Sequence, residues 1–290
     1  MSFNVMNTTI SNEKYSATIN SKGAELNSLI DKSTHQEYIW EGNPEFWGKH
    51  SPVLFPIVGA LKNDSYQYDG KKYSMSRHGF ARDFEFEIIN SDSSSITFEL
   101  KTNEETLKKF PFHFSLKINY ELIENKLVIN YYINNNSNKE MPFSIGAHPA
   151  FALPNEFTNY SLDFEKEEQL FTHELDSNLF SGVTRNIELT ETKLPLKYSL
   201  FEKDALVFKT LQSKKVTILE NHKPLLSVLY DDFQSLGIWT VQNAPFICIE
   251  PWIGFADNWN STGDLFQKEG MCVLKPESEF KAQFSIELFN

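Results

Sequence analysis

An alternation of apolar and polar residues runs through much of this chain and limits it to a fold built from β-strands. Between residues 112 and 120 every second side chain is bulky and apolar, and the side chains between them are polar. After a short turn at residues 124–125 the same pattern resumes over 127–133. Because successive residues of a strand point to opposite faces, a period of two is typical of strands with one buried face. The two segments therefore predict an antiparallel hairpin.

Similar segments recur to the end of the chain, and helical patterns are rare. The further strands that we predict lie at residues 15–19, 24–30, 84–89, 96–101, 216–219, 225–230, 236–241, 246–250 and 280–288. Short helices are expected near 102–105, which has the capping-box spacing of Thr102 and Glu105, and at 264–269. The sequence thus predicts an all-β fold, a large antiparallel β-sandwich with one or two short helices. No linker or repeat divides the chain, so we expect residues 1–290 to form one domain.

The charge balance bears on the partners of the protein. The net charge is −12, from 39 acidic and 27 basic residues. Nucleic acids and anionic membranes are polyanions that require a basic face, so we expect neither as a partner. The first residues lack a signal-peptide pattern, and no apolar stretch reaches the roughly 18 residues of a membrane span. We expect a cytoplasmic protein, and a monomer or homodimer.

Glu250 is the most informative single residue. It follows an apolar run and precedes Pro251, so we expect it at the end of a strand. A carboxyl group in such surroundings is partly desolvated, which raises its pKa toward the range that suits proton transfer. The alternative is a strand-end glutamate that pairs with a lysine or caps a loop. In the same run, Cys248 is expected to be a buried free thiol.

Three further titratable residues lie in apolar surroundings. His148 stands among small residues and before Pro149, which suits close approach of a ligand to the backbone near Gly146, or else a buried histidine bonded to a carbonyl. His78 precedes a glycine and could bind a hydroxyl or stabilise a turn. Asp204 has a weaker case, because Lys203 and Asp204 also suit an exposed strand start. Trp252 could form an apolar wall for a sugar ring, although it could equally pack in the core.

Other chemistries leave no motif in this sequence. The seven histidines are scattered and no set of Cys, His and acidic residues has metal-ligand spacing, so no metal site is predicted. Phosphate-binding glycine loops, GxSxG and GxGxxG are absent from the sequence. Cys248 has apolar neighbours, which raise rather than lower the pKa of a thiol, so we do not expect a nucleophile there.

Taken in order, several segments resemble the galactose mutarotase-like superfamily, and within it the bacterial aldose 1-epimerase subgroup that includes LacX-type proteins. The matching segments, which run from the first strands to the end of the chain, are Gly23-Ala24-Glu25-Leu26, Phe55-Pro56-Ile57-Val58-Gly59, Tyr68-Asp69-Gly70, His78-Gly79-Phe80-Ala81-Arg82, Gly146-Ala147-His148-Pro149-Ala150-Phe151, Glu250-Pro251-Trp252 and Leu274-Lys275-Pro276. Each segment is weak evidence alone. Their order over the whole chain makes the resemblance specific.

The resemblance implies the large antiparallel sandwich of that superfamily and an isomerase that interconverts the α and β anomers of a free hexose without a cofactor. Glu250 matches the family's general base, which takes the proton of the anomeric hydroxyl. His148 matches the general acid, which protonates the ring oxygen. His78 matches a histidine that contacts sugar hydroxyls, and Asp204 matches a substrate-binding aspartate. We expect Glu250 and His148 on opposite sides of one rim cleft, with room for a pyranose between them.

One departure concerns an arginine that many family members carry after the Pro-x-x-Gly segment. Here that stretch reads Val58-Gly59-Ala60-Leu61-Lys62. Either Arg82 or Lys62 supplies the contact, or the preferred sugar differs. If 77–82 is a strand, Arg77 and Arg82 face opposite sides and at most one reaches the site.

Three alternatives remain at this point. A carbohydrate-binding protein with little turnover is possible on the same fold, although a pure binder would need neither the acid nor the base. A hexose-6-phosphate 1-epimerase would require clustered arginines, and the chain has only three. A glycosidase would require two carboxylates, for which Glu250 and Asp257 are the only suggestive pair.

Overall fold

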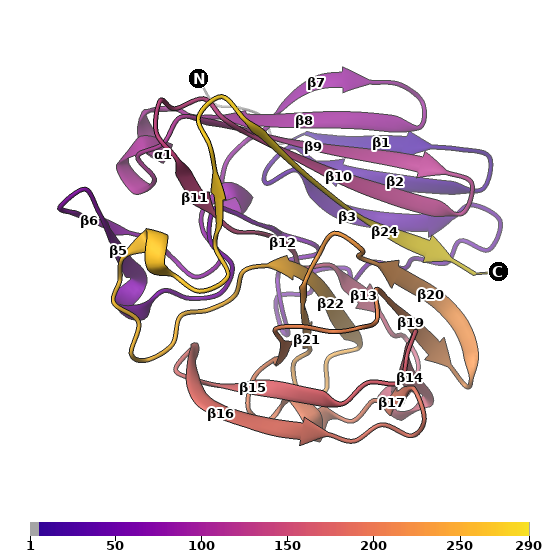
Figure 1. Ribbon diagram of the computed structural model, residues 1–290. Helices are drawn as coiled ribbons and strands as arrows, with labels where there is room; N and C mark the ends of the chain where they lie inside the picture. The colour runs from indigo at the N-terminus through magenta and orange to yellow at the C-terminus, as the bar shows by residue number, and fades with distance from the viewer. Residues whose placement is uncertain (1–5, 290) are drawn as a thin grey trace.

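The computed structural model describes residues 6–289, and an antiparallel sheet of nine strands forms its largest layer (Figure 1). The strands follow one another in the order β17-β14-β19-β20-β24-β10-β9-β8-β7. They are β7 (Glu87–Ser91), β8 (Ser95–Lys101), β9 (Phe114–Ile123), β10 (Lys126–Asn135), β14 (Tyr160–Phe164), β17 (Lys193–Pro195), β19 (Lys215–Glu220), β20 (Lys223–Leu229) and β24 (Glu279–Leu288). The predicted hairpin is the pair β9–β10, in which Tyr120 lies opposite Ile129.

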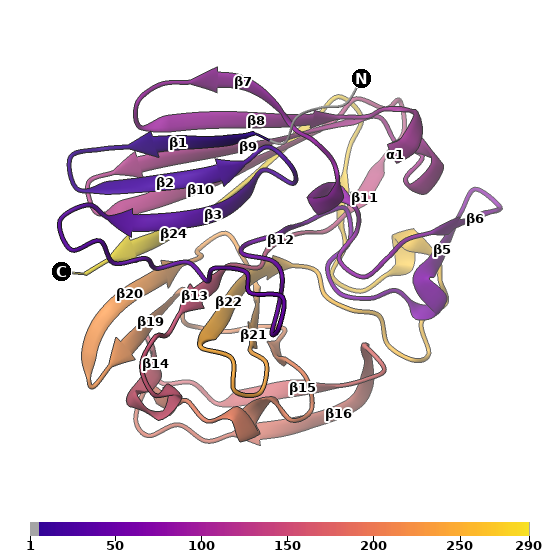
Figure 2. The same cartoon turned by 180° about the vertical axis from the view of Figure 1, so that it is seen from behind.

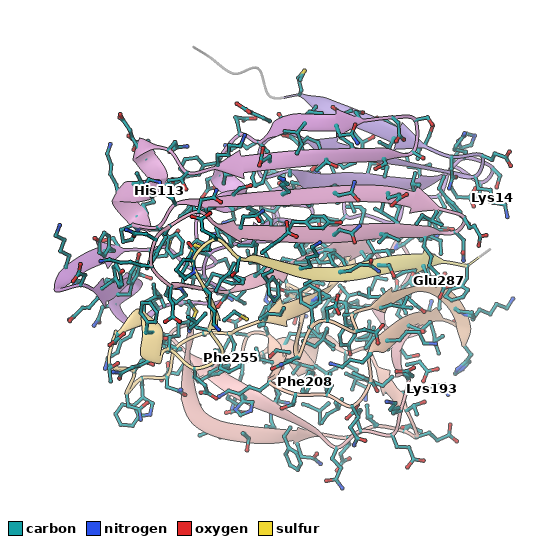
Figure 3. All side chains as sticks on the ribbon, turned by 45° about the horizontal axis from the view of Figure 1, so that its top comes forward. Lys14, His113, Lys193, Phe208, Phe255 and Glu287 are labelled. Carbon is teal, nitrogen blue, oxygen red and sulfur yellow. The ribbon has the colours of Figure 1, made fainter. Side chains whose placement is uncertain are left out.

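Two smaller sheets pack against this layer. Three strands, β1 (Asn7–Ser11), β2 (Tyr15–Asn20) and β3 (Glu25–Asp31), lie over β8–β10, as the view from behind shows (Figure 2). A six-stranded sheet consists of β4 (Val53–Leu54), β12 (Ile145–Ala147), β13 (Ala150–Ala152), β18 (Leu206–Phe208), β21 (Ser235–Trp239) and β22 (Phe246–Ile253). One hydrophobic core joins all three sheets, and it includes Ile19, Leu116 and Ile249. Side chains fill the space between the layers, where Phe208 is buried (Figure 3). The prediction of an all-β antiparallel sandwich is confirmed.

Three two-stranded pairs complete the strand set: β5 (Ser65–Tyr68) with β6 (Lys71–Ser74), β11 (Met141–Phe143) with β23 (Cys272–Leu274), and β15 (Leu170–Asp176) with β16 (Leu179–Ile187). The β15–β16 hairpin runs along the edge of the molecule below β21 and β22 in both views (Figures 1 and 2). The alternation predicted none of these pairs.

Helical structure among the described residues is limited to α1 (Glu104–Lys109) and five 3₁₀ turns, η1 (Lys62–Asp64), η2 (Ala81–Asp83), η3 (Phe157–Asn159), η4 (Tyr198–Phe201) and η5 (Leu265–Gln267). The cap of α1 is one residue later than predicted. Asn103 accepts hydrogen bonds from the N–H groups of Glu105 and Thr106, because the Thr102 hydroxyl is bonded to Phe114 instead. None of the helices in residues 6–289 is long and apolar enough to cross a membrane.

Two local predictions were wrong, and both bear on the site. β22 does not end at Glu250 but continues through Pro251 to Ile253. Residues 77–82 are not a strand. His78 and Gly79 have positive φ angles of 68° and 73°, and η2 follows them.

Candidate active site

β22 is buried along its whole length, and its two faces contact different groups of residues. Ile247, Ile249 and Ile253 point into the main core. The alternate residues, Phe246, Cys248, Glu250 and Trp252, point to the other side of the six-stranded sheet. There Phe246 and Cys248 belong to one small apolar cluster and Trp252 to another. Glu250 stands between these two clusters, in the middle of an apolar strand, with 1% of its surface exposed.

The pairing of β22 with β12 and β13 places His148 beside Glu250. β12 pairs Gly146 with Trp252, and β13 pairs Ala150 with Cys248. The same register continued across the gap sets His148 opposite Glu250, so their side chains lie on the same face. In this register Pro251 lies opposite Ala147, just past the last β12–β22 pair of Gly146 with Trp252, so Pro251 stands where the ladder is interrupted.

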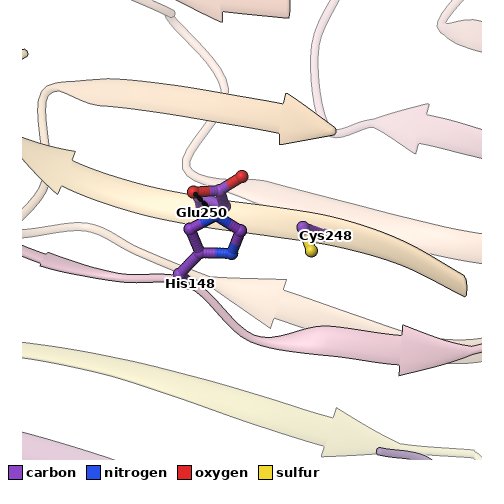
Figure 4. A group of neighbouring side chains, drawn as sticks. All are labelled: His148, Cys248 and Glu250. Atoms are coloured by element: carbon purple, nitrogen blue, oxygen red, sulfur yellow. Dashed lines mark ion pairs between the residues drawn. The ribbon is translucent and has the colours of Figure 1, made fainter. Parts of the chain in front are cut away.

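The two side chains are in direct contact. His148 Nε2 lies 3.2 Å from Glu250 Oε2 (Figure 4). Our expectation that they lie on opposite sides of a rim cleft, with a pyranose between them, is therefore wrong. They form the floor of a cavity, and a ligand must lie over both of them. Among the described residues, His148 Nδ1 and Trp252 Nε1 are buried without a hydrogen-bond partner, and Glu250 Oε2 is buried with no hydrogen bond beyond its contact with His148 Nε2.

Burial shifts both pKa values toward the neutral forms. Desolvation lowers the pKa of His148 from 6.5 to about 3, and Arg77 acts in the same direction. Desolvation raises the pKa of Glu250 well above 4.5, although the positive charge of Arg77 partly opposes this. Burial therefore favours the neutral form of both groups, with the proton on the carboxyl group rather than on the imidazole. A strongly shifted acid and base in one cavity is the usual electrostatic pattern of a catalytic site.

Aromatic rings wall this pair. Trp47 stacks on the His148 imidazole with 4.8 Å between ring centroids, and Trp239 meets the same ring edge-on at 5.7 Å. Trp252 lies across the strands on either side of β22 because those strands carry glycines there. A Cβ at Gly146 or Gly237 would come within 2.7 Å of the Trp252 ring. Gly146 thus makes room for this tryptophan rather than for a ligand, contrary to our expectation.

The turn at residues 76–80 brings His78 and both of its neighbouring arginines to the cavity. His78 is buried, and its Nδ1 accepts a hydrogen bond from the Gly59 N–H. Arg77 Nε lies 3.1 Å from His78 Nε2, and Arg82 donates to the Arg77 carbonyl. Because 77–82 is a turn and not a strand, Arg77 and Arg82 both reach the site, contrary to our prediction.

The cavity has a volume of about 250 Å³ and is lined by Trp47, Arg77, His78, Arg82, His148, Ala205, Trp239, Glu250 and Trp252. Five of the predicted site residues are therefore brought together, namely His78, Arg82, His148, Glu250 and Trp252. This volume lies just below the roughly 300–1,000 Å³ of typical ligand pockets, which suits a ligand of one ring.

Two predicted residues do not line the cavity. Lys62 lies elsewhere, where its ammonium donates to the Ser261 carbonyl, so its position does not support a sugar contact. Asp204 lies just outside, 3.7 Å from the Arg77 guanidinium. Asp257, suggested as a second carboxylate, is ion-paired with Lys268 and faces a different cavity.

The sequence reasoning missed Arg77, Trp47 and Trp239 as site residues. The His-Gly dipeptide after Arg77 was a usable turn signal, because glycine favours positive φ. No local pattern indicates the two tryptophans as site residues. Trp47 precedes β4 by several residues, and Trp239 lies at the end of β21, an ordinary apolar strand.

One group in the described residues has the composition of a metal site. Ligand atoms of His148, Cys248 and Glu250 lie within 4.8 Å of one another (Figure 4). Burial raises the pKa values of the Cys248 thiol and the Glu250 carboxyl well above their ordinary values. Burial therefore disfavours the deprotonated forms of both groups, whereas metal ligands must be deprotonated. Cys248 is buried and free, as predicted.

Known proteins share this architecture. The family model of aldose 1-epimerase matches residues 6–284. The LacX protein of Lactococcus lactis subsp. lactis is 32% identical, over 97% of this chain and 99% of its own. A galactose mutarotase related enzyme from Lactobacillus acidophilus is 38% identical, with a TM-score of 0.94 over 98% of each chain. A galactose mutarotase-like protein from Lactobacillus casei is 33% identical, with a TM-score of 0.92 over 98% of this chain and 100% of its own. The resemblance drawn from the sequence motifs is confirmed.

Proposed function

This chain belongs to the aldose 1-epimerase family, and we propose that it interconverts the α and β anomers of an aldose by opening and closing the sugar ring. The proposal rests on one observation above all, the buried pair of His148 and Glu250 on the floor of a cavity with aromatic walls. The sugar lies over this pair, and its apolar C–H face packs on the tryptophans.

The contact between acid and base fits the reaction. Ring opening removes a proton from the anomeric hydroxyl and adds one to the ring oxygen, and these two oxygens are bonded to the same carbon. One catalytic group must therefore reach each of two neighbouring atoms, and two groups that lie side by side can do this. His148 and Glu250, 3.2 Å apart, meet this requirement.

Before and after ring opening, His148 and Glu250 together carry one exchangeable proton. In the ionised form, Glu250 is a carboxylate and His148 an imidazolium. Glu250 takes the proton of the anomeric hydroxyl, His148 gives its proton to the ring oxygen, and the C1–O5 bond breaks. The pair is then neutral, which is the form that burial favours. After rotation about C1–C2, the same two transfers run in reverse on the other face of the carbonyl.

Arg77 and the bound sugar both affect the balance between the ionised and the neutral form of the pair. The positive charge of Arg77 lowers the pKa of Glu250 and also that of His148. The hydroxyl groups of a bound sugar can hydrogen-bond to the buried polar atoms of the pair, which stabilises its ionised form. The reaction moves only protons and breaks one C–O bond, so the proposed mechanism uses no cofactor.

Polarimetry tests the proposal directly. Fresh α-glucose and α-galactose should relax to the anomeric mixture faster with the protein than without it, in proportion to protein concentration. If a sugar quenches tryptophan fluorescence, and so binds, but its anomers do not interconvert faster with the protein, the protein binds carbohydrate without turnover.

A second candidate substrate is a hexose 6-phosphate, and one observation favours it. Arg77 and Arg82 both line the cavity, and among residues 6–289 Arg82 has no ion-pair partner. We still place the free hexose first, because Arg77 is paired with Asp204 and the chain is acidic overall. The ratio of kcat/KM for glucose and glucose 6-phosphate at low salt decides between them, and a higher value for the phosphate would reverse this order.

A further inference from the structure

Arg77 is held over the cavity by residues from separate parts of the chain. Its guanidinium donates to Asn178 Oδ1 at 2.5 Å and lies 3.7 Å from Asp204. Asn178 stands at the tip of the β15–β16 hairpin, where Ser177 and Asn178 have φ angles of 51° and 69°. Through Phe180 this hairpin joins the apolar cluster that holds Ala205 and Trp252, and through Asn178 it binds Arg77.

The hydrogen bonds around His78 contain one donor too many. The Gly59 N–H points at Nδ1 from 3.1 Å, and the Arg77 Nε–H points at Nε2, also from 3.1 Å. A neutral imidazole carries one N–H and accepts only once. Burial lowers the pKa of His78 well below 6.5, so the ring is neutral. In one of the two contacts, therefore, two N–H groups point at each other and form no hydrogen bond.

Of these two contacts, the one with Arg77 is the one that is broken more easily. The Gly59 N–H is a buried backbone group, fixed by the turn that follows β4, and leaving it without an acceptor costs more than moving a side chain. Arg77 is 38% exposed and can rotate. With Nδ1 as the acceptor, the proton of His78 lies on Nε2 and faces the cavity beside the Arg77 Nε–H. Two donors then converge on one point.

We propose that Arg77 and His78 donate to a single oxygen of the sugar, and that Arg77 is the specificity-determining residue of this site. The inference rests on the proposed function. A hydroxyl oxygen has two lone pairs and accepts from both groups, which removes the conflict between them. Arg77 thereby supplies, from the turn before His78, a cationic sugar contact that Lys62 does not provide. Asn178 and Asp204 are positioning residues, which hold the guanidinium through Nη1.

Substitution of Arg77 tests the shared contact. Arg77→Gln should weaken sugar binding by about 10- to 100-fold, the usual range for a hydrogen bond to a charged group. Arg77→Lys keeps the charge but lacks the Nε–H, so we expect a similar loss. Arg185→Gln removes the same charge outside the cavity, where Arg185 pairs with Glu174, and serves as the matched control. Binding is measured by quenching of Trp47, Trp239 and Trp252 on titration with glucose and galactose.

The titration separates this inference from the proposed function. If wild-type protein binds sugar without turnover, the epimerase proposal fails while the role of Arg77 is still measured. If Arg77→Lys binds as tightly as wild type, the shared oxygen is wrong and only charge matters. If Arg77→Gln also binds as tightly, Arg77 has no contact with the sugar.

The hairpin tip is tested by a second pair of variants. Asn178→Gly removes the acceptor and tolerates the positive φ, whereas Asn178→Asp keeps an acceptor for the guanidinium. We expect the glycine variant to raise KM several-fold at unchanged kcat, and the aspartate variant to restore it. An unchanged KM in Asn178→Gly would remove Asn178 from the positioning role.

Discussion

Among the described residues, two ion pairs have both side chains buried, Asp257–Lys268 and His148–Glu250, and only the first has all its charged groups hydrogen-bonded. Lys268 donates to Asp257 Oδ1 at 3.0 Å and to the Phe255 carbonyl at 2.6 Å, and Asp257 Oδ2 accepts from the Lys62 N–H. By contrast, among the described residues His148 Nδ1 is buried without a partner, and Glu250 Oε2 has no hydrogen bond beyond its contact with His148. Each pair faces a cavity, of about 190 and 250 Å³.

The difference shows that a cavity with charged walls does not by itself identify a site. Burying a polar group without a hydrogen bond costs about 1–3 kcal/mol, so unpaired atoms persist where something other than folding requires them. The Asp257–Lys268 pair meets its own hydrogen-bonding needs and holds the segment after β22 in place. The buried polar atoms of the His148–Glu250 pair can instead be hydrogen-bonded by a ligand.

The largest difference between the two pairs should appear in the stability of variants that break the Asp257–Lys268 pair. Lys268→Met leaves the Asp257 carboxylate buried without its cation, and we expect the free energy of unfolding to fall by about 3–5 kcal/mol. Turnover per folded molecule should stay unchanged. Urea denaturation and polarimetry measure the two quantities. The double variant Asp257→Asn with Lys268→Met removes both charges and should recover much of the loss, and a turnover that falls with Lys268→Met alone would place this pair in the site.

The next effect should be on turnover. Glu250→Gln and His148→Asn should each lower kcat by about 10²-fold or more, because each removes a proton transfer from the transition state. Sugar binding, followed by tryptophan quenching, should persist. Asp257→Asn is the matched control, a carboxyl-to-amide change in the Asp257–Lys268 pair. Near wild-type kcat at saturating sugar in either variant would remove that residue from the mechanism.

The sequence predicted these two residues but not their contact. Glu250 and His148 belong to recognisable motifs, whereas their adjacency depends on the pairing of β22 with β12 and β13, about a hundred residues away. No local pattern encodes such a register. Alternation predicted the long strands for the opposite reason, since each carries its own buried face.

The arginines show a different limit. Arg77 and Arg82 were separated by reading 77–82 as a strand, and the positive φ angles at His78 and Gly79 bring them to the same cavity. Lys62 does not line the cavity, because its ammonium binds a carbonyl nearly two hundred residues later in the chain, at Ser261. Long-range partners of exposed side chains leave no trace in local sequence.

The pH dependence of stability should separate the two members of the His148–Glu250 pair. The folded pKa of His148, about 3, lies below its ordinary 6.5, so the unfolded state binds the extra proton between these values and acid destabilises the fold. The folded pKa of Glu250 is raised above 4.5, so the folded state binds the extra proton and acid stabilises the fold. Between 4.5 and 6.5 the two slopes oppose each other.

Single variants should reveal these slopes with opposite signs. As pH falls from 6.5 toward 4.5, Glu250→Gln should lose stability relative to wild type and His148→Asn should gain it, each by up to about 1.4 kcal/mol per pH unit. Urea midpoints at two pH values in this window measure the difference. Equal slopes in the two variants would contradict the assignment of the proton to the carboxyl group.

The smallest effect should come from chelators, which we expect to change nothing. His148, Cys248 and Glu250 have the composition of a metal site, but burial raises the pKa values of the Cys248 thiol and the Glu250 carboxyl and so favours their protonated forms. A cation would have to displace both protons and also leave Glu250 unable to accept one from the sugar. Polarimetry with and without EDTA, followed by addition of Zn²⁺, makes the comparison. Loss of turnover in EDTA that Zn²⁺ restores would mean that the pair is completed by a metal rather than by the sugar.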